Sequence, residues 1–193
     1  MLGGSLIKSV AAAKAGHYNV SFVSIDPYTG DVNMIIWEHG AFKSGGWRFL
    51  RNENGRGRIY DRFLANVKAA GHDDAVVPIC ASAIVGLRVI RVLVEEKRLR
   101  TLPQVIYLDS AHEADETMLE LVTAWNVLES GGILFGDDWG WGTVRGDVER
   151  FAKLKQPVVD TVKLRSLQQL LTGSTIDAFG VLLHEGQWIL AKQ

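Results

Sequence analysis

The chain has 193 residues, a net charge of −1 with its five histidines neutral, 47% hydrophobic residues and 22% charged residues. These proportions exclude a disordered chain, and the small net charge gives no overall field that would draw the protein to nucleic acid or to an anionic membrane. No apolar stretch approaches the ~20 residues that span a bilayer, and the N-terminus lacks the pattern of a signal peptide. The only cysteine, Cys80, excludes an internal disulfide. We therefore expect a cytoplasmic protein with a single domain over residues 1–193.

Apolar segments of two periodicities alternate along the chain. Helical periodicity predicts helices over residues 6–15, 60–70, 113–128 and about 144–154, and another that begins after Ser82. Short apolar segments predict strands that end at Ile25 and that cover residues 75–80, 105–108 and 132–135. Because these strands are apolar on both faces, they fit a parallel sheet that helices cover on both sides. The helix over 113–128 is expected to turn inward Met118, Leu121, Val122 and Trp125.

The C-terminal part breaks this alternation. Residues 158–162, 178–183 and 188–190 predict strands, and residues 184–187 predict the turn of a hairpin. Alternating strands and helices followed by an antiparallel hairpin predict an α/β fold with a doubly wound, mostly parallel sheet of the Rossmann type. Residues 36–59 are rich in glycine and lack periodicity, which predicts a lid loop over the binding site.

The first candidate site lies at the start of the chain, because ligands of doubly wound sheets bind beyond the carboxyl ends of the strands. Gly3 and Gly4 open the first helix, where N–H groups can meet a polar cofactor group. Asp26 ends the next strand, 22 residues after Gly4, which is about the spacing at which an acidic residue reaches the ribose of a nucleoside cofactor. The alternative is that the two glycines form one turn and Asp26 starts another.

The second candidate site follows the next two strands along the chain. Asp109 ends one strand, His112 comes three residues later, and Asp137 and Asp138 follow the other strand. If these strands are neighbours, three carboxylates converge, and their repulsion favours a bound cation or a shared proton. Oxygen ligands favour Mg²⁺ or another hard divalent ion over Zn²⁺. The alternative is that Asp109 and Asp138 cap helices and that His112 is an ordinary residue of a helix start.

Two motifs at these positions resemble the class I S-adenosylmethionine-dependent methyltransferases. More narrowly, they resemble the metal-dependent macrolide sugar O-methyltransferases and the cephalosporin hydroxylase group. Residues 107–113, YLDSAHE, are similar to the motif of the family's fourth strand, in which His follows Asp at three residues. Residues 128–138, LESGGILFGDD, are similar to its Leu-x-x-Gly-Gly-x-x-x-x-Asp-Asp motif on strand five. The resemblance covers roughly residues 3–151.

The resemblance implies a Rossmann-like methyltransferase fold and assigns roles to single residues. The positions that it assigns to S-adenosylmethionine are Gly3, Gly4, Asp26, Ala81, Ser82 and Asp109. The acidic positions that bind Mg²⁺ in the metal-dependent members match Asp109, Asp137 and Asp138, and their proposed base matches His112. The family's first motif has an acidic residue and a further glycine ahead of the position of Gly3, so the resemblance implies that this chain is truncated at its N-terminus and lacks the first strand.

The leading hypothesis is therefore Mg²⁺-assisted transfer of a methyl group from S-adenosylmethionine to a hydroxyl of a small molecule, such as a sugar or a catechol-like ring. A hydroxylase-like relative is one alternative. Another is a cofactor-binding protein without catalytic activity, or a subunit that acts only with a partner. A nicotinamide dehydrogenase is disfavoured because no complete Gly-x-Gly-x-x-Gly motif is present. The expected partner is a hydroxylated small molecule, with neither nucleic acid nor a membrane, and a homo-oligomer is possible.

Overall fold

The computed structural model describes residues 3–30, 52–53, 56–110 and 112–193. By its internal contacts the chain divides into two compact units, Met1–Ser82 and Ala83–Gln193. Among the described residues, the first unit has two two-stranded sheets and the second unit has one five-stranded sheet. The expected single domain over residues 1–193 stays a prediction. No helix of the described part has the length and the apolar character that crossing a membrane requires.

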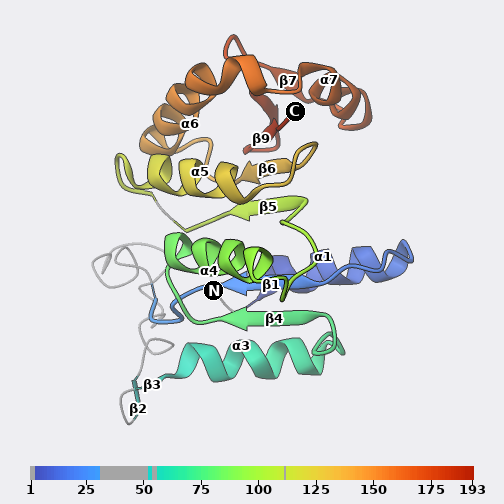
Figure 1. The fold of residues 1–193 in the computed structure, drawn as a ribbon, viewed down its shortest axis with the longest axis vertical. Helices are drawn as coiled ribbons and strands as arrows, with labels where there is room; N and C mark the ends of the chain where they lie inside the picture. Colours follow the sequence, from blue (N-terminus) through green and yellow to red (C-terminus); the bar gives the residue numbers. More distant parts are fainter. Residues whose placement is uncertain (1–2, 31–51, 54–55, 111) are drawn as a thin grey trace. The chain divides into compact units, whose positions relative to one another are not determined.

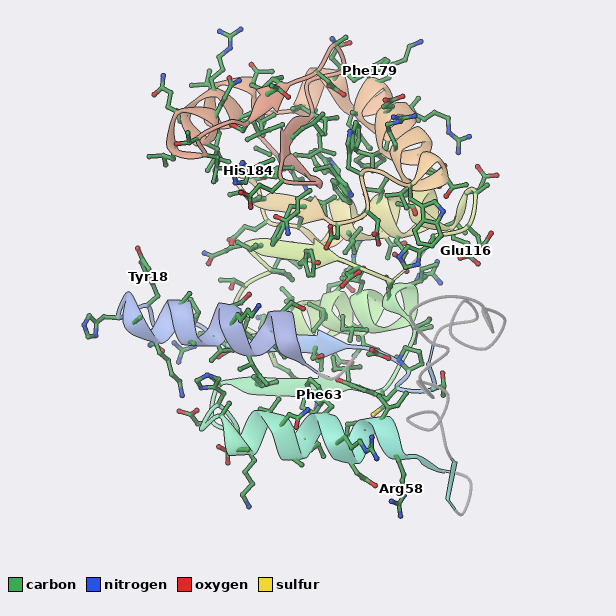
Figure 2. All side chains as sticks on the ribbon, turned by 180° about the vertical axis from the view of Figure 1, so that it is seen from behind. Tyr18, Arg58, Phe63, Glu116, Phe179 and His184 are labelled. Atoms are coloured by element: carbon green, nitrogen blue, oxygen red, sulfur yellow. The ribbon has the colours of Figure 1, made fainter. Side chains whose placement is uncertain are left out.

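The first unit is built on two parallel strands, β1 (Phe22–Ile25) and β4 (Val76–Ile79) (Figure 1). The helices α1 (Gly4–Ala15) and α3 (Arg58–Ala69) supply much of its core, and Phe63 points from α3 toward the strands (Figure 2). The buried apolar residues of this core are Val10, Tyr28, Ile59, Phe63, Val67 and Val76. Two short strands, β2 (Asn52–Glu53) and β3 (Arg56–Gly57), pair antiparallel just before α3.

The second unit contains a five-stranded mixed sheet in the order β5-β6-β9-β8-β7. Strands β5 (Val105–Leu108) and β6 (Ile133–Gly136) are parallel. The C-terminal strands β7 (Thr175–Ile176), β8 (Leu182–His184) and β9 (Gln187–Ala191) are antiparallel to their neighbours. The predicted α/β fold with a C-terminal antiparallel hairpin is therefore confirmed.

The hairpin turn between β8 and β9 also follows the prediction from sequence. Glu185 and Gly186 both have positive φ angles, 48° and 85°. Two consecutive residues with positive φ are typical of the two-residue turn whose twist matches that of the flanking strands.

Helices α4 (Ala83–Glu95), α5 (Glu116–Val127), α6 (Gly142–Lys155) and α7 (Thr161–Leu170) complete the second unit. The rings of Trp125 on α5 and Phe151 on α6 meet edge to face, with centroids 5.5 Å apart. Leu134 and Leu190, from the paired strands β6 and β9, are fully buried. This core supports the loops that follow β5 and β6.

The prediction of a strand over residues 158–162 is wrong. Helix α7 begins at Thr161, and only Val159 keeps a single bridge, to the residue after β9. The carboxylate of Asp160 accepts a hydrogen bond from the N–H of Lys163 at 2.9 Å, which is the capping contact of a helix start. The β-branched residues of the segment produced the strand signal, but this cap starts a helix instead.

The predicted lid over residues 36–59 falls mostly outside the described residues. Of that range, the structure describes only β2, β3 and the first two residues of α3. The lid stays a prediction.

Gly136, the last residue of β6, leaves no room for a side chain. A Cβ atom there would overlap the ring of Trp188 and lie 2.7 Å from the carbonyl oxygen of Leu108. Because overpacking costs about 1–3 kcal/mol, we expect Gly136→Ala to lower the free energy of unfolding by at least about 1 kcal/mol in a urea titration. The matched control is Gly146→Ala within α6, where a methyl group would meet nothing within 4 Å. That variant should be as stable as the wild type or about 0.5–1 kcal/mol more stable. Equal stability of the wild type and Gly136→Ala would contradict this packing.

Candidate functional site

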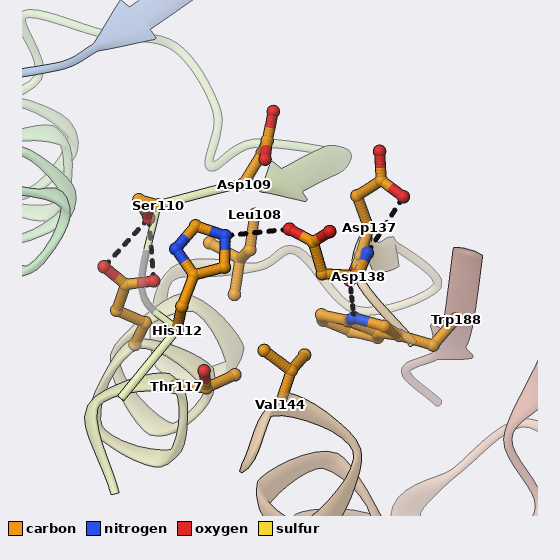
Figure 3. Close-up of a pocket in the computed structure, with 10 residues that line it drawn as sticks. Leu108, Asp109, Ser110, His112, Thr117, Asp137, Asp138, Val144 and Trp188 are labelled. Atoms are coloured by element: carbon orange, nitrogen blue, oxygen red, sulfur yellow. Dashed lines mark hydrogen bonds and ion pairs between the residues drawn. The ribbon is translucent and has the colours of Figure 1, made fainter. Parts of the chain in front are cut away.

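An acidic cluster forms at the carboxyl ends of β5 and β6. Asp109 directly follows β5, and Asp138 lies two residues beyond β6. Leu108 pairs with Gly136, so both loops leave the sheet at the same edge. One ligand atom each from Asp109, His112 and Asp138 lies within 4.8 Å of the others (Figure 3). The structure thus brings together three residues that the sequence pointed to.

His112 is held through its ring and its backbone. Its Nε2 lies 2.8 Å from a carboxylate oxygen of Asp138. The ring of Trp141 packs on the imidazole with a centroid distance of 4.8 Å. The hydroxyl of Thr143 donates to the carbonyl oxygen of His112 at 2.5 Å. These contacts fix the direction in which the imidazole faces.

Asp137 occupies a neighbouring position. Its carboxylate accepts the N–H of Asp138 at 2.9 Å and faces the hydroxyl of Tyr107 at 3.4 Å. Asp138 has a φ of 60°, a left-handed conformation that residues other than glycine seldom adopt. The carboxylate of Asp137 therefore supports the strained backbone that presents Asp138, and its role as a metal ligand stays a prediction.

The C-terminal hairpin supports the same loop from another side. Trp188 on β9 is only 1% exposed, and its Nε1 donates to the carbonyl oxygen of Asp137 at 3.1 Å. The N–H of Trp139 donates to the carbonyl oxygen of Gly186, in the hairpin turn, at 3.0 Å. The hairpin thus fixes the loop that carries both aspartates.

Negative charge accumulates at this edge of the sheet. Loss of solvation raises the pKa of Asp109, and the charges of Asp138 and Asp137 raise it further. Burial raises the pKa of Tyr107, and the neighbouring carboxylates of Asp109 and Asp137 raise it further. A cation bound among these carboxylates would relieve their repulsion.

A small cavity lies between these side chains. Its volume of about 10 Å³ is roughly that of one water-sized sphere. Its polar lining includes Asp109, His112 and Asp138 together with Thr117 and Glu120. The cavity fits an ion or a water molecule, so an organic acceptor would have to lie outside it.

Sequence reasoning missed Glu120 although it placed part of the inner face of α5 correctly. Leu121 and Trp125 are buried as predicted, whereas Val122 is 41% exposed. The buried face also includes Thr117, Glu120 and Ala124. Glu120 accepts the hydroxyl of Ser110 at 2.9 and 2.8 Å, and burial raises the pKa of its carboxyl. Glu120 lies four residues before the buried Ala124, and this helical spacing was the available signal.

The other predicted residues lie at strand ends in the first unit. Asp26 follows β1, and its N–H donates to the carbonyl oxygen of Ile79 at 3.2 Å, so it lies beside the segment with Ala81 and Ser82. One carboxylate oxygen of Asp26 accepts the N–H of Tyr28 at 2.6 Å. Asp109, which the resemblance also assigns to the cofactor, belongs to the other unit.

Gly3 and Gly4 begin α1, as the sequence predicts. Gly3 has a φ of 82°, and a Cβ atom there would lie 3.1 Å from the ring of Phe63. Tyr28 packs on the same ring, with centroids 5.0 Å apart, so the start of α1 and the turn after Asp26 share one support. At Gly4 a Cβ atom would meet no atom of the described residues within 4 Å. The described residues therefore leave space beside the first turn of α1, where helix N–H groups have no intrahelical partner.

Comparison with known proteins identifies the fold. No protein-family model matches the sequence, and no curated protein matches it. A structure of the calicheamicin methyltransferase CalS11 matches with a TM-score of 0.55 at 15% identity, over 98% of this chain and 68% of that one. An apo structure of CalS11, described as a TDP-rhamnose 3′-O-methyltransferase, matches over the same shares with a TM-score of 0.50 at 16% identity. The chain therefore has the Rossmann-like fold of these methyltransferases, which confirms the predicted resemblance at the level of the fold.

The raised pKa of Asp109 predicts how stability depends on pH. Because the pKa in the folded state exceeds the ordinary carboxyl value, the folded protein holds this proton more tightly than the unfolded chain does. Stability is therefore lost as pH rises from the ordinary carboxyl range through the raised pKa. Without added divalent ions, Asp109→Asn should melt at a higher temperature than the wild type near pH 7, and the difference should shrink toward about pH 4.

Thermal melts at these two pH values measure the effect. The exposed Asp73 supplies the control, since Asp73→Asn removes a charge outside the cluster and should leave the difference near zero. A lower melting temperature of Asp109→Asn near neutral pH would show that the carboxylate stabilises the fold.

Proposed function

We propose that this protein is an S-adenosylmethionine-dependent methyltransferase that methylates a hydroxyl of a small molecule with the help of a divalent cation such as Mg²⁺. The observation that carries the proposal is the convergence of Asp109, His112 and Asp138 on an ion-sized cavity at the ends of adjacent parallel strands. The fold shared with the calicheamicin methyltransferase supports the reaction type. The description of the same enzyme as a TDP-rhamnose 3′-O-methyltransferase supports a sugar as acceptor.

The residues of the cluster fit a hard divalent cation. Carboxylate oxygens are preferred ligands of such ions, and the pKa of Asp109 is raised first by burial and then by the charges of Asp138 and Asp137. Asp109 and Asp138 would hold the cation, with Asp137 beside them as the third candidate ligand. Bound there, the cation would hold the acceptor oxygen and lower the pKa of its hydroxyl.

His112 is the candidate general base, because an imidazole can accept a proton near neutral pH. An ionised carboxylate only accepts hydrogen bonds, so the Nε2 that lies 2.8 Å from Asp138 carries the hydrogen in this contact. To accept a proton at Nε2, His112 has to part from Asp138. If the Asp138 carboxylate bound the cation, it would release the imidazole of His112. Binding of the cation would then be coupled to proton acceptance by His112.

The cofactor would lie at the strand ends of the first unit. Asp26 would accept hydrogen bonds from the ribose hydroxyls, and Ala81 and Ser82 would border the adenine. The free space at Gly4 would admit a cofactor group to the N–H groups of α1. Gly3 would shape this turn through its positive φ.

The decisive experiment is a methyl-transfer assay with S-adenosylmethionine, Mg²⁺ and a panel of sugar nucleotides and catechols. We expect S-adenosylhomocysteine to form only when cofactor, cation and a matching acceptor are all present. His112→Ala should lower kcat by roughly 10²–10⁴ because it removes the base, while calorimetry should show unchanged cofactor affinity. His184→Ala is the control, since His184 lies on β8 outside the cavity. A near-normal kcat of His112→Ala would assign proton removal to another group.

A separate calorimetric experiment tests the cofactor site. Asp26→Ala should weaken binding of S-adenosylmethionine at least about tenfold, because charge-assisted hydrogen bonds to the ribose are lost. Asp26→Asn keeps an oxygen for the N–H of Tyr28 and so separates loss of the turn from loss of the charge. Asp61→Ala, at an exposed position on α3, should bind normally. Unchanged affinity of both Asp26 variants would remove this residue from the site.

A further inference from the structure

Helix α5 turns one carboxylate into the protein. Its buried face includes Thr117, Glu120, Leu121 and Ala124, which are spaced as one side of a helix. The two polar members, Thr117 and Glu120, both line the cavity that contains His112. Glu120 is 8% exposed, and a buried carboxylate is unfavourable unless hydrogen bonds satisfy it. An apolar residue would be cheaper for the fold at this position, so the explanation for Glu120 has to come from the cavity.

The contact of Glu120 with Ser110 reaches the functional segment. The Ser110 oxygen lies 2.9 and 2.8 Å from the two carboxylate oxygens. A hydroxyl has one proton, so this donor can fully satisfy only one of the two oxygens at a time. Ser110 directly follows Asp109 and lies two residues before His112. Glu120 thus holds the segment that carries two of the three cluster residues.

The same segment is held from two other elements. Asp138, beyond β6, contacts the imidazole of His112, and Thr143 on α6 donates to the His112 carbonyl. Figure 3 shows His112 between the Asp138 carboxylate and Ser110 with its partner carboxylate. Removing the Glu120 contact would leave the Ser110 side of the segment without this anchor.

We propose that Glu120 is a positioning residue. By holding Ser110 from inside the second unit, its carboxylate fixes Asp109 and His112 in the arrangement that receives the cation and the acceptor proton. This inference rests on the function proposed above, but its direct consequence is the placement of His112 in the protein without metal.

A positioning role and a purely structural role predict different effects on stability. Among the described residues, Ser110 is the donor to this buried carboxylate, and one hydroxyl does not fully offset its loss of solvation. Replacing the carboxylate with a neutral group should therefore leave the melting temperature unchanged or raise it. The placement of His112 and the affinity of the cluster for a divalent cation should nevertheless be impaired. A residue that only supports the fold would lose stability and site geometry together.

The experiment uses the full chain and two variants, Glu120→Met and Ser110→Ala, each of which removes the hydrogen bond between Ser110 and Glu120. The first readout is the ¹⁵N chemical shifts of the His112 ring in metal-free protein, assigned by their loss in His112→Ala. The second is Mn²⁺ affinity by electron paramagnetic resonance, with Asp138→Asn as the reference for a lost ligand. Glu116→Met is the matched control, because Glu116 is exposed on the same helix.

We expect both variants to shift the His112 signals and to weaken Mn²⁺ binding at least about tenfold, as loss of a residue that orients a ligand does. The melting temperature of Glu120→Met should not fall, and Glu116→Met should behave like the wild type. The double variant should bind Mn²⁺ about as weakly as Glu120→Met, because both changes remove the same contact.

Two results would overturn the proposal. One is Glu120→Met with wild-type His112 signals and wild-type Mn²⁺ affinity. The other is loss of both together with a clear fall in melting temperature, which would make Glu120 a support of the fold. If the wild type itself binds no Mn²⁺, the proposed metal site fails, and the His112 signals of the metal-free variants still decide the role of Glu120.

Discussion

The parallel pairing of β5 with β6 is the constraint on which the candidate site depends. Parallel strands end at one edge of the sheet, so Asp109 and Asp138 meet there although they are far apart in the sequence. A parallel pair also requires a crossover connection, which here is α5. That crossover carries Thr117 and Glu120 into the wall of the cavity. One topological feature therefore supplies both the acidic cluster and the groups that surround it.

The antiparallel hairpin supports the loop that follows β6, as α5 supports the segment that follows β5. Trp188 covers Gly136, and its indole N–H holds the carbonyl of Asp137. The left-handed backbone of Asp138 costs of the order of 1–3 kcal/mol. Burying an indole such as that of Trp188 contributes roughly 4–6 kcal/mol by its area. Packing at the end of β9 is thus large enough to maintain the strained conformation that presents Asp138 to the cavity.

The sequence predicts those parts of the site that depend on short stretches of chain. Asp109 and Asp138 are recognisable because each follows a short apolar strand, and the turn at Gly186 needs only local turn chemistry. Glu120 is not recognisable in this way, since its burial depends on how α5 rotates against the rest of the second unit. Apolar periodicity assigns a carboxylate to solvent. The strand predicted over residues 158–162 failed because the pattern weighs apolar side chains and gives no weight to a helix cap.

The distribution of unfavourable groups in the second unit points to its function. Raised carboxyl pKa values at Asp109 and Glu120 mean that the folded state pays to keep these groups ionised at neutral pH. Away from this edge, the unit buries apolar contacts such as those of Trp125 with Phe151, and the buried carboxylate of Asp147 is paired with Arg150. A fold selected for stability alone would put apolar side chains at the edge as well. The carboxylates around one ion-sized cavity are the feature on which the proposed cation site rests, because the charge of a cation would make the same arrangement favourable.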